Sequence, residues 1–218
     1  MLASSSVRVR KPRSRYHHGD LRRALLQEAV RTIAEDGVER LTLREAGTRL
    51  GVSRTALYRH FSDKASLLAA VARDGFQRFR LDLVDAWAVA PDSHRGLVLM
   101  GEAYVRFAVA NPGHYRVMFG DFRHLCGKDP ELEADAGAAF RVLTTALTSL
   151  QKSGLVRKDD TRQLSEFVWS IVHGIAMLAI SGQLGPDPVA SGELDGLVHL
   201  AIRRMRTGID VERKSARR

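Results

Sequence analysis

The sequence predicts an all-α protein in two parts, a small N-terminal three-helix head and a larger helical domain, joined by one long helix. Three observations predict this fold. Apolar residues recur at helical spacing along most of the 218 residues. Capping residues, Gly and Pro mark where these segments begin and end, and no segment alternates apolar and polar residues as a strand does. With 44% hydrophobic residues, the chain can bury a substantial core.

The first predicted helix begins near Asp20, which can cap it, and ends at Gly37. Its apolar residues recur at every fourth position: Leu21, Leu25, Ala29 and Ile33. We expect this helix to pack across the next two, because one apolar face must be covered by other elements.

The next segment has the pattern of a helix-turn-helix. Thr42 and Glu45 form a capping box that opens a helix over 43–50, Gly51 ends it, and Ser53 caps the following helix. The small core shared by these two helices is expected to contain Ala46, Leu50, Val52, Leu57 and Phe61. The second helix is then left with an outward face of polar and basic residues.

Beyond the head, Ser62 and Asp63 are expected to cap a long helix that runs to about Trp87. Further helices are predicted over about 93–110, 112–119, 130–152, 160–182 and 192–207. The domain boundaries expected from this pattern are a flexible basic arm over 1–15, the head over 16–65, the larger domain over 66–207 and a basic tail over 208–218.

Charge is distributed unevenly along the chain. The whole sequence carries +9, with 14 basic and 7 acidic residues over 1–64, 13 and 16 over 65–202, and 7 and 2 over 203–218. Basic residues that neutralise phosphates must cluster on the element that docks, so this polarity favours double-stranded DNA as a partner of the head. The alternative, an ordinary helical hairpin with a solvated charged face, does not predict the polarity.

Other classes of protein are disfavoured. The single cysteine, Cys126, excludes an internal disulfide and fits a reducing compartment. The apolar run over 167–180 is interrupted and too short to span a bilayer, and the N-terminus lacks a signal peptide, so we expect a cytoplasmic protein. We find no catalytic motif in the sequence, and Asp74, Glu102 and Asp159-Asp160 are isolated carboxylates. We therefore expect neither an enzyme nor a cofactor. The pair His17-His18 lacks further metal ligands at suitable spacing, which favours a structural or phosphate-binding role.

Three motifs stand out in the head: Gly51-Val52-Ser53, Leu57-Tyr58-x-His60-Phe61 and Lys64-x-x-Leu67. With them, the head closely resembles the DNA-binding domain of TetR-type (tetracycline-repressor-like) transcriptional regulators. The entry over 16–22 is similar to one branch of that family, and Trp169, His173 and Gly174 resemble the residues for which that branch's WHG-type C-terminal domain is named. The resemblance implies an Ω-shaped homodimer whose regulatory domain binds a small molecule and releases DNA.

The second helix of the motif supplies the expected contacts to DNA. Arg54 can pair with guanine edges, and Thr55 and Ala56 can contact a thymine methyl. Tyr58 and His60 are expected on phosphates, with local packing an equal alternative for His60. The positive charge of Lys64 lies in the first turn of its helix, beside the positive end of the helix dipole, which is unfavourable. An anion bound between the two would remove the conflict, which suggests a bound phosphate. The full candidate set is Thr42, Arg44, Ser53, Arg54, Thr55, Ala56, Tyr58, Arg59, His60 and Lys64.

The helix over 160–182 has two apolar stripes, and we expect one to face an internal pocket and the other a partner subunit. The residues expected to contact an effector are Met100, Tyr104, Phe107, Tyr115, Met118, Phe119, Trp169, His173 and Met177. The residues expected at a dimer interface are Leu164, Val168, Ile171, Ile175, Leu178, Leu194, Leu197 and Ala201. For each single residue, simple core packing is the alternative.

The expected function is a sequence-specific DNA-binding transcriptional regulator, a homodimeric repressor released from its operator by a small, largely apolar effector. A constitutive or architectural DNA-binding dimer without an effector is the alternative. Activation instead of repression also remains open at this point, because repression rests on the family resemblance.

Overall fold

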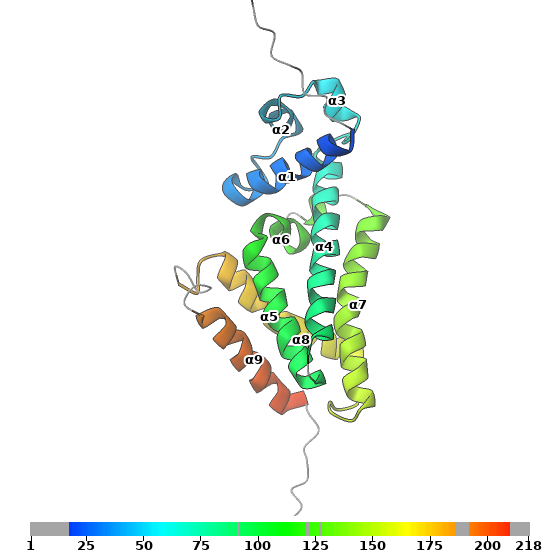
Figure 1. Cartoon of the computed structure of the whole chain (residues 1–218), viewed down its shortest axis with the longest axis vertical. Coiled ribbons are helices and arrows are strands. Elements are labelled where there is room, and N and C mark those ends of the chain that lie inside the picture. Colours follow the sequence, from blue (N-terminus) through cyan, green and yellow to red (C-terminus); the bar gives the residue numbers. More distant parts are fainter. Residues whose placement is uncertain (1–17, 91, 121–122, 127, 186–191, 210–218) are drawn as a thin grey trace, which may run out of the picture.

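The computed structural model describes residues 18–90, 92–120, 123–126, 128–185 and 192–209, and within these ranges it contains helices and no strand (Figure 1). The all-α prediction is confirmed. The elements are α1 (His18–Asp36), α2 (Leu43–Arg49), α3 (Arg54–Tyr58), α4 (Lys64–Ala88), α5 (Ser93–Ala110), α6 (Pro112–Phe119), η1 (Arg123–Cys126), α7 (Pro130–Lys152), α8 (Thr161–Ile180) and α9 (Glu193–Ile209).

The head consists of α1, α2 and α3, with α1 lying across the base of the helix-turn-helix (Figure 1). The four periodic apolar residues of α1 are all buried, as their spacing predicts. Ala46, Leu57 and Phe61 are buried beside them, whereas Leu50 and Val52 are only partly covered. Gly51 has a φ of +66°, the left-handed conformation that the turn between α2 and α3 requires.

The caps differ in detail from the expected pattern. The Thr42 hydroxyl accepts from the Glu45 backbone N–H at 3.1 Å, but it also donates to the Glu45 carboxylate at 3.2 Å, so that carboxylate does not reach back to the Thr42 amide. A reciprocal capping box occurs instead at α4, where Asp63 accepts from the Ser66 amide and the Ser66 hydroxyl accepts from the Asp63 amide. Asp63, and not Ser62, is therefore the N-cap of the long helix.

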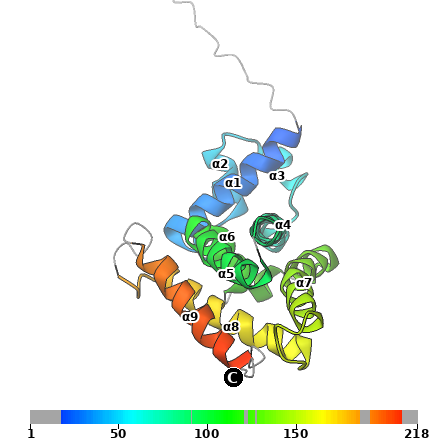
Figure 2. The same ribbon diagram turned by 60° about the horizontal axis from the view of Figure 1, so that its bottom comes forward.

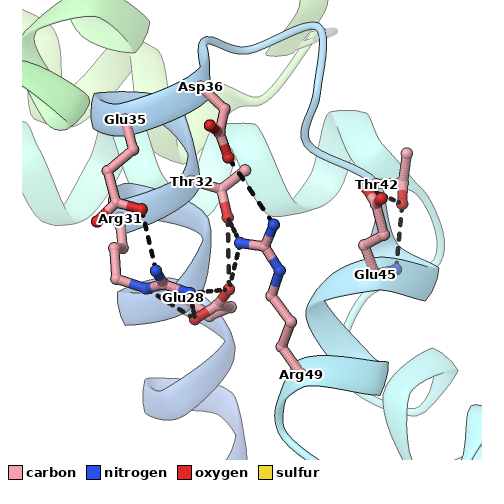
Figure 3. Close-up of polar contacts among 8 residues, drawn as sticks. All are labelled: Glu28, Arg31, Thr32, Glu35, Asp36, Thr42, Glu45 and Arg49. Atoms are coloured by element: carbon pink, nitrogen blue, oxygen red, sulfur yellow. Dashed lines mark hydrogen bonds and ion pairs between the residues drawn. The ribbon is translucent and has the colours of Figure 1, made fainter.

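A buried carboxylate ties α1 to α2 (Figure 3). Glu28 accepts hydrogen bonds from Arg31 on its own helix at 2.8 Å and from Arg49 of α2 at 3.1 Å. Burial by itself raises the pKa of Glu28, but the hydrogen bonds and charges of the two arginines outweigh burial and hold it below its usual range. The network orients α2 relative to α1, and α3 follows α2 through the tight turn.

Helix α4 is the connection between head and body (Figure 1). Its 25 residues span about 37 Å at 1.5 Å per residue, from the head to the far end of α5. Around it, α5, α6 and α7 pack directly on α4, while α8 lies between α9 and α7 (Figure 2). The length of α4 and its end at Ala88 agree with the predicted long helix that ends near Trp87.

Helix α8 begins before the interrupted apolar run over 167–180 and includes all of it. An 18-residue window of this helix has a mean hydropathy of 1.4, so by length and composition alone the helix could cross a membrane. The expectation from sequence concerned only the run over 167–180, and one such helix is weak evidence for a membrane span. In the structure α8 packs on α5, α7 and α9, and core helices of soluble proteins pass the same test.

Candidate nucleic-acid interface and internal cavity

The exposed face of α3 lies at the end of the head farthest from the body (Figure 1). Arg54, Thr55, Tyr58 and Arg59 are all exposed, with the Tyr58 side chain at 44%, and the Arg54 guanidinium lies 5.5 Å from the centre of the Tyr58 ring. Helix α3 itself ends at Tyr58, so Arg59 caps it and His60 lies in the following turn. A short helix of this kind can enter a major groove by its first turn.

Ser53 and Ala56 support this face. The Ser53 hydroxyl accepts from the Ala56 backbone N–H at 3.2 Å, which fixes the start of α3. Ala56 is half-buried against the core of the head, so only part of its methyl group is available to a thymine.

Five arginines of the head fall into two groups by their partners. Arg31 and Arg49 pair with carboxylates of α1 and hold the head together. Arg44, Arg54 and Arg59 are exposed, and in the described part of the chain none of them pairs with a carboxylate. The structure thus separates arginines that stabilise the fold from arginines that remain available to phosphates and bases.

Lys64 does not behave as its position suggested. It is half-buried, and its ammonium donates to the backbone carbonyl oxygen of Val38 at 2.6 Å, away from the start of α4. The conflict with the helix dipole is therefore relieved inside the head, and no phosphate is needed to explain this residue. Thr42, in contrast, is exposed at the start of α2 beside Arg44.

The body contains a cavity of about 330 Å³ between α4, α5, α7 and α8, closed by single residues from α6 and α9. Its wall is almost entirely apolar. Six aromatic side chains line it: Phe76, Phe79, Tyr104, Phe119, Phe140 and Trp169. Cavities of this size and composition are typical sites for small ligands.

A hydrogen-bonded network lies at one wall of the cavity. The Trp169 indole N–H donates to Tyr104 Oη at 2.9 Å, Tyr104 Oη lies 3.0 Å from Tyr115 Oη, and Tyr115 Oη lies 2.8 Å from His173 Nδ1. Burial raises the pKa of both tyrosines and lowers the pKa of His173, so all the groups are neutral near pH 7. The His173 Nδ1 also lies 3.0 Å from Tyr104 Oη, so the ring joins both tyrosines.

Only some of the residues expected to contact an effector line the cavity. Met100, Tyr104, Phe119 and Trp169 line it. Phe107, Met118 and Tyr115 are buried in the surrounding core instead, and Met177 is exposed at 38%. His173 does not line the cavity, but its ring contacts the lining residues Tyr104, Phe119 and Trp169. Helices α4 and α7 contribute wall residues that the sequence did not indicate: Phe76, Phe79, Leu83, Ala136, Gly137, Ala139, Phe140 and Leu143. In the sequence, these residues could be recognised only as members of apolar helix faces.

The residues expected at a dimer interface differ in how far they are exposed. Leu164, Ile175 and Leu194 are buried within the subunit, and Val168 lines the cavity, so these four side chains present little surface to a partner. Ile171, Leu197 and Ala201 are partly buried, and Leu178 is exposed at 41%. The outward stripe of α8 instead includes Phe167, exposed at 48%, together with Ile171, Gly174 and Leu178.

Helix α6 contacts both the head and the cavity. Near its start, the Cα of Gly113 lies so close to α1 that an added Cβ would be 2.5 Å from the Val30 carbonyl oxygen. Arg116 donates to the carbonyl oxygen of Ala34, near the end of α1, at 3.2 Å. At the other end of α6, Phe119 lines the cavity. A change in the cavity wall can therefore reach α1 through one short helix.

Some expectations lie outside the described residues. These are the basic arm over 1–15, the side chains of His17 and His18, and all but the first two residues of the basic tail over 208–218. Within the described ranges, no group of three His, Cys, Asp or Glu side chains is arranged to hold a metal ion.

Comparison with known proteins places both parts of the chain. Residues 25–71 match the bacterial regulatory proteins of the tetR family, and residues 97–205 match the tetracyclin repressor-like C-terminal domain. The HTH-type transcriptional repressor Rv1474c of Mycobacterium tuberculosis is 27% identical over 195 residues, which cover 86% of this chain and 96% of that protein.

Two further relatives are similar. The nucleoid occlusion factor SlmA of Shewanella amazonensis is 28% identical over 149 residues, covering 66% of this chain and 73% of that protein. A solved structure of a protein with unknown function from Rhodococcus sp. RHA1 is 30% identical, covers 91% of this chain and all of its own, and superposes with a TM-score of 0.79.

The regulators of the tetR family bind operator DNA as dimers and are not enzymes. Both family matches fall on the parts of the structure described above, the helix-turn-helix head and the helical body with its cavity. The chain therefore belongs to the TetR family of transcriptional regulators.

Proposed function

We propose that this regulator is a homodimeric repressor, which leaves its operator when a small, largely apolar effector fills the cavity of the body. The observation that carries the proposal is the connection between two sites. An exposed basic face on α3 and an apolar cavity of about 330 Å³ belong to one rigid frame, joined by α4 and by the contact of α6 with α1. The name of the mycobacterial relative supports repression, and a DNA-binding role would place the protein in the cytoplasm.

For the DNA contacts, we assign base recognition to Arg54 and Thr55, with a partial contribution from the Ala56 methyl. Tyr58, Arg59 and His60 would contact phosphates on one side of the groove, and Thr42 with Arg44 on the other, where the first amides of α2 favour an anion. Ser53 acts as the cap that holds this face in position. The contact of Lys64 with Val38 removes that lysine from the set.

For the dimer, we assign the outward stripe of α8, formed by Phe167, Ile171, Gly174 and Leu178, together with the exposed Leu200 of α9. Only 33% of the apolar window of α8 is buried within the subunit, which leaves a large apolar surface without cover. Large exposed apolar patches of this kind mark association surfaces. Sedimentation at micromolar concentration would test this assignment, because a monomer alone would contradict it.

For the coupling, we assign α6 as the element that transmits filling of the cavity to the head. An effector that pushes against Phe119 displaces α6, and Gly113 and Arg116 carry the displacement to α1. The two recognition helices of a dimer must stand about 34–36 Å apart to meet successive major grooves, so a small rotation of each head weakens binding. Almost complete release requires the effector to favour the released state by about 5.5 kcal/mol.

The DNA-binding part is tested by selecting bound sequences from a random DNA pool and titrating the selected fragment with salt. The logarithm of the binding constant should fall with the logarithm of salt concentration, by about 0.9 for each phosphate contact. Arg44→Gln should lower that slope by about one, whereas Arg54→Gln should mainly change the preferred sequence. A slope near zero would contradict the proposed face.

A second candidate function is a constitutive DNA-binding dimer without an effector, because one relative has a name, nucleoid occlusion factor, that mentions neither repression nor an effector. The two candidates differ in the cavity. Trp169 lines it and Trp87, the other tryptophan of the chain, does not. In a Trp87→Phe variant, a ligand that enters the cavity should change the Trp169 fluorescence and release operator DNA. Ligand binding without release would favour the constitutive binder.

A further inference from the structure

Charged residues meet the cavity at one place on its wall. Arg162 and Glu166, one turn apart on α8, both line it, and the Arg162 Nε lies 3.0 Å from a carboxylate oxygen of Glu166. Their side chains are 82% and 49% exposed, so this part of the wall is the mouth of the cavity. The two terminal nitrogens of Arg162 pair with no carboxylate in the described part of the chain.

A second guanidinium lies on α7, beside a residue of the cavity wall. Gly137 lines the cavity, and the Nη1 atom of Arg141 lies 3.1 Å from the position that a Cβ would take on Gly137. Arg141 is exposed and forms no ion pair with any described residue. Two arginines and one carboxylate therefore lie on or beside residues that line the cavity, a net charge of +1.

The interior offers a ligand no comparable polar group. The indole N–H of Trp169 is already donated to Tyr104, and the Tyr104 hydroxyl is shared with Tyr115 and His173. A polar or charged group placed deep in this cavity would lose its hydration without gaining a partner. The charged or polar end of a ligand is therefore restricted to the mouth.

The volume limits the apolar part. A cavity of about 150 Å³ is known to hold benzene, so 330 Å³ accommodates about twice that number of carbon atoms, roughly twelve. The body of the ligand is then a medium-length alkyl chain or two fused rings.

We propose, on the basis of the function proposed above, that the effector is an amphiphilic monoanion with an apolar body in the cavity and a carboxylate at the mouth. The carboxylate binds the free nitrogens of Arg162 and is attracted by Arg141. An exposed ion pair of residues one turn apart contributes little to stability, so the ligand can replace Glu166 as the partner of Arg162 with little loss. The planar guanidinium also favours a bidentate carboxylate over a single hydroxyl.

The test compares three probes that share one alkyl chain and differ in charge: decanoate, decan-1-ol and decylammonium. Binding is followed by Trp169 fluorescence in the full-length Trp87→Phe protein, with operator release measured in parallel. Decanoate should bind about tenfold more tightly than decanol, and decylammonium more weakly than both. Arg162→Gln and Arg141→Gln should each weaken decanoate several-fold and leave decanol unchanged.

A variant that is expected to bind decanoate more tightly serves as a control, because a misfolded protein would not gain affinity. Glu166→Gln keeps the shape of the side chain but removes the competing carboxylate, so it should strengthen decanoate binding about twofold. Decanol that binds as tightly as decanoate would overturn the inference, as would no binding of any probe or a loss of decanol binding equal to that of decanoate in the arginine variants. Failure of the proposed function would look different, because operator DNA would then stay bound while a probe saturates the cavity.

Discussion

The contact between α6 and α1 can be tested by one methyl group, in the variant Gly113→Ala. The added Cβ would lie 2.5 Å from the Val30 carbonyl oxygen and 3.2 Å from the Val30 Cγ1. The oxygen belongs to the backbone of α1 and cannot rotate away as a flexible side chain could. Since carbon and oxygen atoms approach to about 3.3 Å at closest, α1 and α6 would have to separate by about 0.8 Å.

Two effects of this change oppose each other, and their magnitudes decide the outcome. Replacing Gly by Ala within a helix gains up to about 1 kcal/mol of helix propensity. Forcing an extra carbon into a packed contact costs about 1–3 kcal/mol. We expect a net destabilisation of about 1–2 kcal/mol, together with weaker operator binding, because both heads of the dimer change position.

The matched control is Gly196→Ala in α9, where no atom lies within 4 Å of the added Cβ. It should gain helix propensity without a clash and raise the free energy of unfolding by up to about 1 kcal/mol. Both variants are compared with the parent protein by urea denaturation at one protomer concentration, because the stability of a dimer depends on concentration. A Gly113→Ala protein as stable as the Gly196→Ala protein would refute the close contact of α6 with α1.

Three further predictions concern the head and the dimer. Arg54→Ala should lower the affinity for the selected operator by about 1–3 kcal/mol and relax the preference at one base pair, measured by fluorescence anisotropy on matched and mismatched fragments. Equal losses on every sequence would mean that Arg54 contacts only phosphate. Phe167→Glu should give a monomer in sedimentation while the helical circular dichroism is kept, because it replaces the most exposed apolar side chain of the α8 stripe by a charge; a dimer of unchanged affinity would move the interface elsewhere. The pKa of Glu28 is lowered in the folded head, so the stability it contributes is present above the usual glutamate pKa of about 4.3 and is lost as pH falls through the folded value. Glu28→Gln should therefore destabilise the protein by about 1.5–3 kcal/mol at pH 7 and flatten its acid unfolding below about pH 4.5; an unchanged acid profile would show that another carboxylate dominates.

The helices were predictable from sequence because their signals are local. A cap such as Ser53, a Gly such as Gly51 with its left-handed backbone, and apolar residues at every fourth position act within one or two turns. The helix-turn-helix and its outward residues Arg54 and Thr55 follow from the same local rules. The head could therefore be placed almost residue by residue.

The sites of the body depended on contacts between helices that are distant in sequence. Periodicity shows which residues share a face of α8, but it does not show which neighbour covers that face. Only the packed structure directs Val168 into the cavity and leaves Phe167 outside. The cavity itself is a volume left between α4, α5, α7 and α8, and no single segment contains a signal for it.

The amino-acid sequence thus determined the helices, the head and the kind of surface that meets DNA, because caps, turns and periodic apolar residues act over short distances. Tertiary structure decided that Lys64 binds Val38 and not a phosphate, that α6 touches α1, and that Arg162 lines the cavity while Arg141 lies beside its wall residue Gly137. Each of these depends on the direction of a side chain across a gap between elements, and that direction is fixed only when the helices pack together.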